Sequence, residues 1–165
     1  MISNGPLERL LGLRVAAGTT EVETLSGGRT SAVGWATVEL DRAAAELGRA
    51  LRVPPEAFVE APGTPVLGAR CRVATGLLPD GISVVLLEPI TEGRLASTLA
   101  RLDEGPAAVW LAVDDLAGAL AVVQGRGGHA SLARPGPFGD ECLVLDGPIH
   151  GPYRLLIERP GTIRS

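Results

Sequence analysis

The chain has 165 residues, 45% of them hydrophobic, and a formal net charge of −4, which suits one globular domain or two small halves that share a core. No apolar run is long enough to span a membrane, and the N-terminus lacks the basic start and long apolar core of a signal peptide. We therefore expect a cytoplasmic protein without a membrane partner. All fifteen cationic residues are arginines and form no basic face, so we expect no nucleic-acid partner.

Residues 1–31 are predicted to form an N-terminal extension. Asn4 and Pro6 favour a short helix that ends at Leu13, with proline in its first turn, and residues 20–25 are predicted to form a strand. The pattern leaves open whether this extension packs on the core or on a partner subunit.

Residues 32–104 are predicted to form a first module of strands and helices. A turn at residues 78–81 (Leu-Pro-Asp-Gly) separates its last two strands, and a Pro/Gly-rich connection precedes them. The predicted elements are a strand over 32–38, a helix over 40–52, strands near 67–75 and 82–88, and a short linking helix over 94–102.

Residues 105–165 are predicted to form a second module in the same order. An apolar strand over 107–113 ends at Asp114 and Asp115, where a carboxylate can cap the helix over 115–124. Cys71 in the first module and Cys142 in the second lack CxxC spacing, and we expect both to be buried free thiols. Three further strands are predicted near 129–133, over 141–145 and over 153–158.

The two modules are related by an internal repeat. Residues 32–47 align with residues 108–123 without a gap, and both segments have the order strand, acidic residue, helix. The last strands also correspond, since residues 84–89 (VVLLEP) are similar to residues 155–160 (LLIERP). Each half therefore has the predicted order β-α-β-β-β, and the fold class is α+β.

Three segments carry a resemblance to a known family: residues 86–90 (LLEPI), 112–121 (AVDDLAGALA) and 153–160 (YRLLIERP). Together with the repeat, they resemble the vicinal oxygen chelate superfamily, which includes glyoxalase I, methylmalonyl-CoA epimerase and bleomycin-binding resistance proteins. The resemblance covers most of the chain from residue 32 to residue 160. It implies a curved, cup-shaped mixed sheet with helices on its outer face, and a homodimer. It specifies the fold and not the activity.

The resemblance also implies where a metal would bind, because enzymes of this superfamily hold a divalent cation inside the cup. The four ligand positions fall on Ala32, Val85, Ala108 and Leu156, whose side chains cannot bind a cation. We therefore expect a protein without a metal or another cofactor.

The same alignment predicts the lining of the cup. The residues that share a strand face with the ligand positions are small and apolar, apart from one large aromatic side chain, and they would lie inside the cup. Trp110 would stack on a flat organic ligand, or else it fills the core where the modules meet. The predicted lining residues are Ala32, Gly34, Ala36, Val85, Ala108, Trp110, Ala112 and Leu156.

Three arginines are expected near the cup. Arg154 shares the parity of Leu156, and Arg70 and Arg72 lie on the face of strand 69–73 opposite to Cys71. If the Cys71 face meets the helices, these guanidinium groups favour a carboxylate, a phosphate or a polyoxygenated ligand. The alternative is that the arginines solvate an edge strand.

The leading hypothesis is a metal-free protein that binds a small organic molecule, aromatic or polyoxygenated, for example to sequester an antibiotic or another natural product. The second is an isomerase, cyclase or lyase of the same superfamily in secondary metabolism, cofactor-independent or metal-dependent. The third is an interaction module whose cup is filled by side chains.

Asp140 and Glu141 are expected to lie in a solvated turn or a rim. Candidates for acid–base catalysis are Glu88, Glu141, Glu158, Tyr153 and His150, unranked, and a displaced metal site would use His150 with Glu158 or Glu88.

Overall fold

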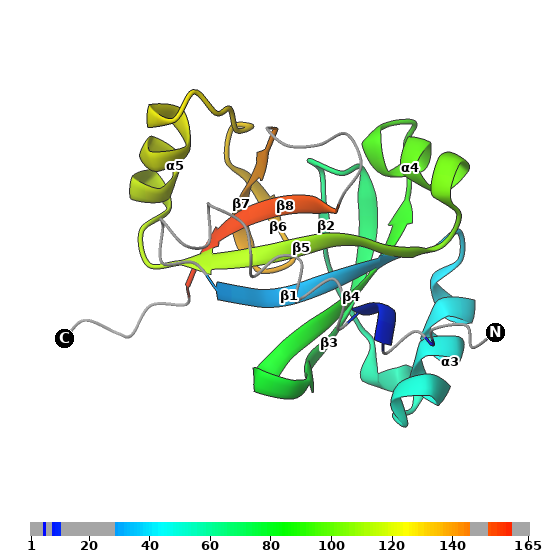
Figure 1. Ribbon diagram of the computed structural model, residues 1–165. Helices are drawn as coiled ribbons and strands as arrows, with labels where there is room; N and C mark the ends of the chain where they lie inside the picture. The colour runs from blue at the N-terminus through cyan, green and yellow to red at the C-terminus, as the bar shows by residue number, and fades with distance from the viewer. Residues whose placement is uncertain (1–4, 6–7, 11–28, 146–151, 160–165) are drawn as a thin grey trace.

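The computed structural model describes residues 5, 8–10, 29–145 and 152–159 (Figure 1). Within the N-terminal extension, residues 8–10 are helical and pack on the core. Leu10 is fully buried, and the guanidinium carbon of Arg9 lies 4.9 Å from the ring centroid of Trp35. The rest of the predicted helix and the strand predicted over 20–25 lie outside the described residues. No helix in the described part of the chain is long and apolar enough to cross a membrane.

The described strands form one mixed sheet in the order β2-β3-β4-β1-β5-β8-β7-β6. The first strands of the two modules, β1 and β5, pair antiparallel at its centre, and each pairs in parallel with the last strand of its own module, β4 or β8. The predicted α+β fold with paired modules is confirmed. The elements are β1 (Arg29–Ala36), α3 (Leu40–Leu51), the short 3-10 helix η1 (Pro55–Ala57), β2 (Val59–Thr64), β3 (Ala69–Leu78), the 3-10 turn η2 (Pro79–Gly81), β4 (Ile82–Pro89), α4 (Arg94–Leu102), β5 (Gly105–Val113), α5 (Leu116–Gly125), β6 (Arg134–Gly136), β7 (Gly139–Val144) and β8 (Tyr153–Glu158).

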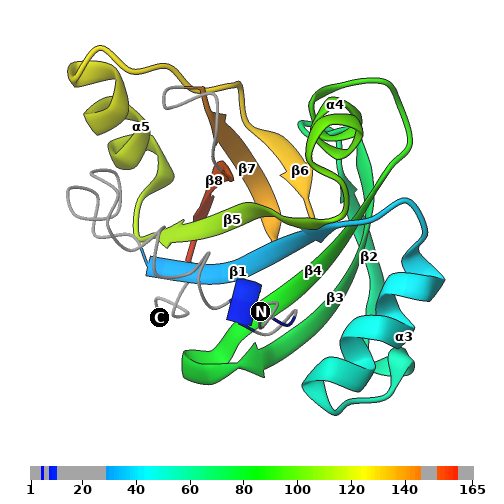
Figure 2. The same cartoon turned by 45° about the vertical axis from the view of Figure 1, so that its right-hand side comes forward.

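The sheet curls until its two edge strands, β2 and β6, contact each other. In Figure 2 both strands lie below α4, with β6 to the left of β2. We call the concave side of this curled sheet the cup. α3 and α5 pack on the opposite, outer face through side chains such as Leu47 and Val123. α4 instead packs with the cup residues through Leu95, which is fully buried. The linking helix therefore covers part of the cup.

Strands buried on both faces divide their side chains between two clusters. On β5, for example, Val109 and Leu111 belong to the outer cluster, whereas Trp110 belongs to the cup. Apolar residues on both faces explain why the central strands are near-continuous hydrophobic runs. The principal cup residues are Ala32, Ala36, Cys71, Val73, Val85, Leu87, Ala108, Trp110, Ala112, Leu143, Leu155 and Ile157.

The sequence missed one strand and misplaced another. β2 contains Pro62 and Gly63, which belong to the Pro/Gly-rich segment predicted to be a connection. Proline is tolerated in β2 because it is an edge strand of the sheet. β6 begins at Arg134 instead of near residue 129, and Ala130 makes only an isolated bridge to Val144. Asp115 is the N-cap residue of α5, at the predicted position, but its side chain makes no capping hydrogen bond.

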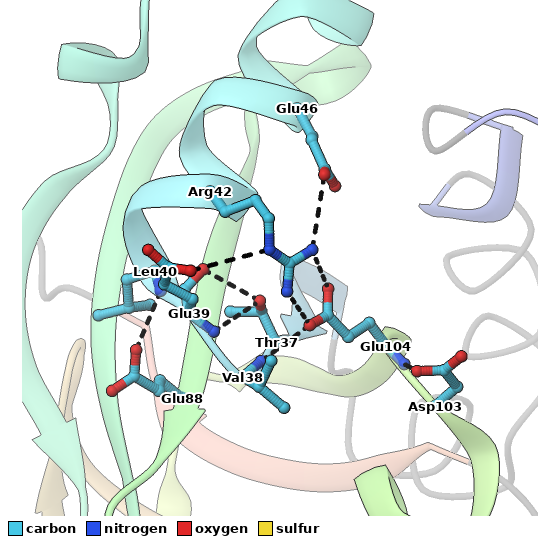
Figure 3. A network of polar contacts seen from close by, with 9 residues as sticks. All are labelled: Thr37, Val38, Glu39, Leu40, Arg42, Glu46, Glu88, Asp103 and Glu104. Atoms are coloured by element: carbon cyan, nitrogen blue, oxygen red, sulfur yellow. Dashed lines mark hydrogen bonds and ion pairs between the residues drawn. The ribbon is translucent and has the colours of Figure 1, made fainter.

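A polar network joins the start of α3 to the segment that links the modules (Figure 3). The Val38 N–H donates to Oε2 of Glu104 at 3.1 Å, and Arg42 donates from Nη1 and Nη2 to the two oxygens of the same carboxylate at 3.2 and 2.5 Å. The Leu40 N–H, one of the free donors of the first helical turn, donates to Oε2 of Glu88 at 2.9 Å. Carboxylates from β4 and from the linker therefore hold the N-terminus of α3.

Candidate functional site

Trp110 is the largest side chain in the cup. It is fully buried, and its ring lies against Gly34 of β1, where a Cβ atom would come 2.9 Å from the ring and 3.2 Å from the Cβ of Ala108. Glycine at position 34 therefore makes room for the indole. Phe138, half-buried in the turn between β6 and β7, packs edge-on against it with ring centroids 5.7 Å apart and an interplanar angle of 74°. Trp110 thus faces the cup and fills the core there, and its stacking on a ligand stays a prediction.

Glu141 places a carboxyl group inside this apolar cup. It follows Asp140 on β7 and shares the face of Leu143, and its exposure is 0%. The Trp110 indole N–H donates to Oε1 at 3.0 Å, and the Thr64 hydroxyl hydrogen-bonds to Oε2 at 2.5 Å. The expectation that Glu141 lies in a solvated turn or a rim is wrong. The carboxyl group instead connects β7 to the edge strand β2 and to the central strand β5.

Burial controls the ionisation of the acidic groups in the cup. It raises the pKa of Glu141, and the hydrogen bonds from Thr64 and Trp110 oppose that shift only in part. Burial also raises the pKa of the Cys71 thiol to about 12, with a further contribution from the charge of Glu141. Cys71 and Cys142 are both buried and free, as predicted. The chemistry available in the cup is therefore that of a shielded carboxyl group beside a protonated thiol.

Most of the predicted lining residues do face the cup. Ala32, Val85 and Ala108 are fully buried there with Trp110, and Gly34 lies beneath the indole. Their role in binding a ligand stays a prediction. The predicted orientation of one residue is wrong: Leu156 packs in the outer cluster, and its neighbours Leu155 and Ile157 face the cup instead.

The three arginines expected near the cup lie on the other side of the sheet. Cys71 and the alternate residues of β3 point into the cup, which turns Arg70 and Arg72 toward the helix-covered face. The Arg70 Nε lies 3.5 Å from Oε1 of Glu88, and Nη2 of Arg72 lies 2.7 Å from Oδ1 of Asp41 on α3.

Arg154 has the same outward orientation. It is in register with Val109 and Val144, and both of these residues belong to the outer cluster. The predicted set of guanidinium groups around an anionic ligand is therefore not assembled in the cup.

Of the four acid–base candidates that the structure describes, Glu141 is the one whose acidic group is buried inside the cup. Glu88 holds the start of α3, and Glu158 is exposed. The Tyr153 hydroxyl donates to the carbonyl oxygen of Arg94 at 2.9 Å, so it anchors α4 to β8. His150 lies outside the described residues. Residues 141–144 (Glu-Cys-Leu-Val) show no polar–apolar alternation and are all buried, so the sequence did not indicate which face Glu141 takes.

The residues at the metal positions that the resemblance implies do not fit a metal. Ala32, Val85 and Ala108 carry no donor atom, and neither do the two cup-facing residues of the last strand, Leu155 and Ile157. In the described ranges, no group of three or more His, Cys, Asp or Glu side chains is placed to hold a cation.

Comparison with known proteins connects the chain to solved structures. No protein-family model matches it, and no curated protein matches it either. The chain is similar to methylmalonyl-CoA epimerase from Mycobacterium tuberculosis, with 19% identity over 88% of this chain and 96% of that chain and a TM-score of 0.67. It is also similar to a hypothetical protein from Bacillus halodurans, with 15% identity over 84% of this chain and 99% of that chain and a TM-score of 0.66. A third similar structure is methylmalonyl-CoA epimerase from Streptomyces coelicolor, with 22% identity over 81% of this chain and 98% of that chain and a TM-score of 0.62. At these identities the likeness shows the fold.

Proposed function

We propose that this protein, which has the fold of the vicinal oxygen chelate superfamily, binds a small organic molecule in its cup. The observation that supports the proposal is the fully buried carboxyl group of Glu141. Burying an ionisable group costs free energy that an apolar side chain of similar size would not cost. Such groups are concentrated at functional sites. The surrounding small apolar residues and Trp110 are typical of a pocket for an organic ligand, in which a few polar groups fix the orientation.

Binding requires part of the rim to move, because the cup side chains around Glu141 are fully buried. The rim is formed by half-buried residues, Ala61, Val66, Leu99, Phe138 and Tyr153, that pack on the cup residues. Phe138 is the rim residue whose ring packs edge-on against Trp110, so displacing its ring would uncover the indole beside Glu141. We propose that a ligand enters at this position.

Fluorescence of Trp110 tests the proposal directly. The chain has two tryptophans, and a Trp35→Phe variant leaves Trp110 as the sole indole. A saturable change in its emission with one compound of a panel of aromatic amines, alcohols and acids, together with a higher unfolding temperature, would support binding in the cup. The matched Trp110→Phe variant keeps Trp35, which packs in the outer cluster, and should show no emission change. If no compound changes either signal up to millimolar concentration, the cup is core filling and the proposal is wrong.

Proton transfer is the second candidate function, and the raised pKa of Glu141 favours it. A buried carboxyl group that keeps its proton at higher pH is a suitable general acid, and its conjugate base a suitable general base. Two of the similar structures are methylmalonyl-CoA epimerases. Incubation with methylmalonyl-CoA in D2O would test this chemistry, because proton abstraction and return would exchange the hydrogen between its two carbonyl groups. Exchange in the wild-type protein and not in Glu141→Gln would support an enzyme over a sequestering protein.

A further inference from the structure

The charge balance of the cup is unusual for a buried site. Within the described part of the chain, Glu141 is the only residue of a charged type that is buried, and no ion pair to it is present. Its two hydrogen-bond partners, Trp110 and Thr64, are both neutral. Among the described residues, ionisation of Glu141 would therefore leave a negative charge in an apolar environment without a counter-charge, which is costly.

The groups on the neighbouring strands do not supply that counter-charge. Arg134 on β6 is the register partner of Glu141, but it is exposed. The register partner of Glu141 on β8 is Ile157, which carries no charge. Cys71 of β3 has a protonated thiol, which is also neutral. The adjacent Asp140 is exposed and has the same sign of charge as an ionised Glu141.

The carboxyl group keeps hydrogen-bonding capacity for a ligand. Each of its oxygens takes part in one hydrogen bond, to the Trp110 indole or to the Thr64 hydroxyl. An ionised carboxylate offers about four lone-pair positions, so about two remain. An ammonium group has several N–H donors and carries the missing positive charge, whereas an anionic ligand would be repelled.

From this charge balance we infer that the ligand of the cup is a small hydrophobic cation, an arylalkylamine or a compound of the same chemistry. Its ammonium group would bind the free side of the Glu141 carboxylate, and its ring would take the place of the Phe138 ring against Trp110, where the two rings now stand 5.7 Å apart. The indole adds a cation–π attraction for a charge held close to it. This inference rests on the proposed function. It replaces the anionic ligand that the arginine positions had predicted.

A set of benzyl compounds of nearly equal size tests the charge preference. Benzylamine, benzyl alcohol and benzoate differ chiefly in the charge of the group beside the ring, and each is titrated against the Trp35→Phe protein. We expect benzylamine to bind at least about tenfold more tightly than the alcohol, and benzoate to bind most weakly. The affinity for benzylamine should rise about tenfold per pH unit below the pKa of Glu141, because Glu141 must lose its proton to pair with the ammonium group.

Variants separate Glu141 from other carboxylates. Glu141→Gln should remove the preference for benzylamine and its pH dependence while benzyl alcohol still binds, and the exposed control Glu158→Gln should change neither. If Glu141→Gln does not fold, the comparison of the three compounds on the Trp35→Phe protein still decides. Equal or tighter binding of benzyl alcohol or benzoate would overturn the cation inference and leave the proposed function standing. Absence of binding by all three compounds and by the wider panel would overturn the proposed function itself.

Discussion

A Cβ atom on Gly136 would overlap the Oε1 atom of Glu141. The edge strand β6 therefore lies directly against the buried carboxyl group, at the place where the sheet curls back toward β2. The same carboxyl group is hydrogen-bonded to the Thr64 hydroxyl at the end of β2. The position of the Glu141 side chain and the contact between the edge strands β2 and β6 therefore depend on each other.

Gly136→Ala is expected to destabilise the protein. The added methyl group forces the Glu141 side chain away from its partners, and overpacking of this kind costs about 1–3 kcal/mol. Urea denaturation measures the difference in the free energy of unfolding. Gly125→Ala at the end of α5 is the control, because its Cβ meets nothing within 4 Å and alanine is favoured in a helix. Equal stability of Gly136→Ala and the wild type would show that β6 does not hold the carboxyl group.

Glu141→Gln is expected to change how stability depends on pH. Because burial raises the pKa of Glu141 above its ordinary value of 4.5, the folded state holds a proton that the unfolded state has lost. The stability that comes from this proton is complete below about pH 4.5 and is lost as pH rises through the raised pKa. Unfolding free energies measured across this range should therefore fall for the wild type and fall less for the variant. Parallel curves would show that Glu141 is solvated in solution.

The Cys71 thiol is expected to react very slowly in the folded protein. With burial holding its pKa at about 12, its thiolate fraction is about a thousandfold below that of an ordinary thiol with a pKa of about 8.5. A Cys142→Ser variant isolates this thiol, and its reaction with a disulfide reagent at pH 8 is compared in buffer and in denaturant. Fast reaction in buffer would mean that burial does not shield the Cys71 thiol in solution, which would contradict this prediction.

Glu104→Gln is expected to weaken the junction between the modules at neutral pH. Burial alone would raise the pKa of Glu104, but the hydrogen bonds from Arg42 and Val38 and the charge of Arg42 outweigh it and lower the pKa. Stability from the charged form is therefore present above the ordinary pKa of 4.5 and is lost as pH falls through the lowered value. Thermal unfolding should separate variant and wild type at pH 7 and bring them together in acid. The exposed control Glu46→Gln should have a smaller effect at either pH.

Much of the fold could be predicted because the repeat supplies the same information twice. Residues 32–47 and 108–123 share a strand that ends in an acidic residue and a helix that follows it, and the structure has both units in the predicted places. The ligand positions implied by the family resemblance indicated which residues of β1 and β5 face the cup. The face of Trp110 was therefore predicted correctly, with Ala32 and Ala108 beside it.

The site could be predicted less well because the sequences of β8 and β3 do not show which of their two faces points into the cup. Residues 155–157 of β8 are Leu-Leu-Ile and are all buried, so no alternation distinguishes the two faces, and an error of one residue reverses every side chain. Alternation in β3 was clear, but either face can be buried in a sheet covered on both sides. The arginines are accommodated on the helix side because Asp41 and Glu88 lie there to pair with them.

The antiparallel pairing of β1 with β5 has a consequence for a chain cut in two. A break after Glu104 would keep the Arg42–Glu104 contact within the first fragment and would leave each fragment with one unpaired, apolar strand at its edge. Such an edge is a template for pairing, and the other fragment is the segment that fits it. We expect residues 1–104 and 105–165 to aggregate separately and to complement each other when mixed, with the recovery of a buried Trp110 fluorescence as the measure. Two proteins fused to these fragments would then be brought together by the reassembly of a single sheet.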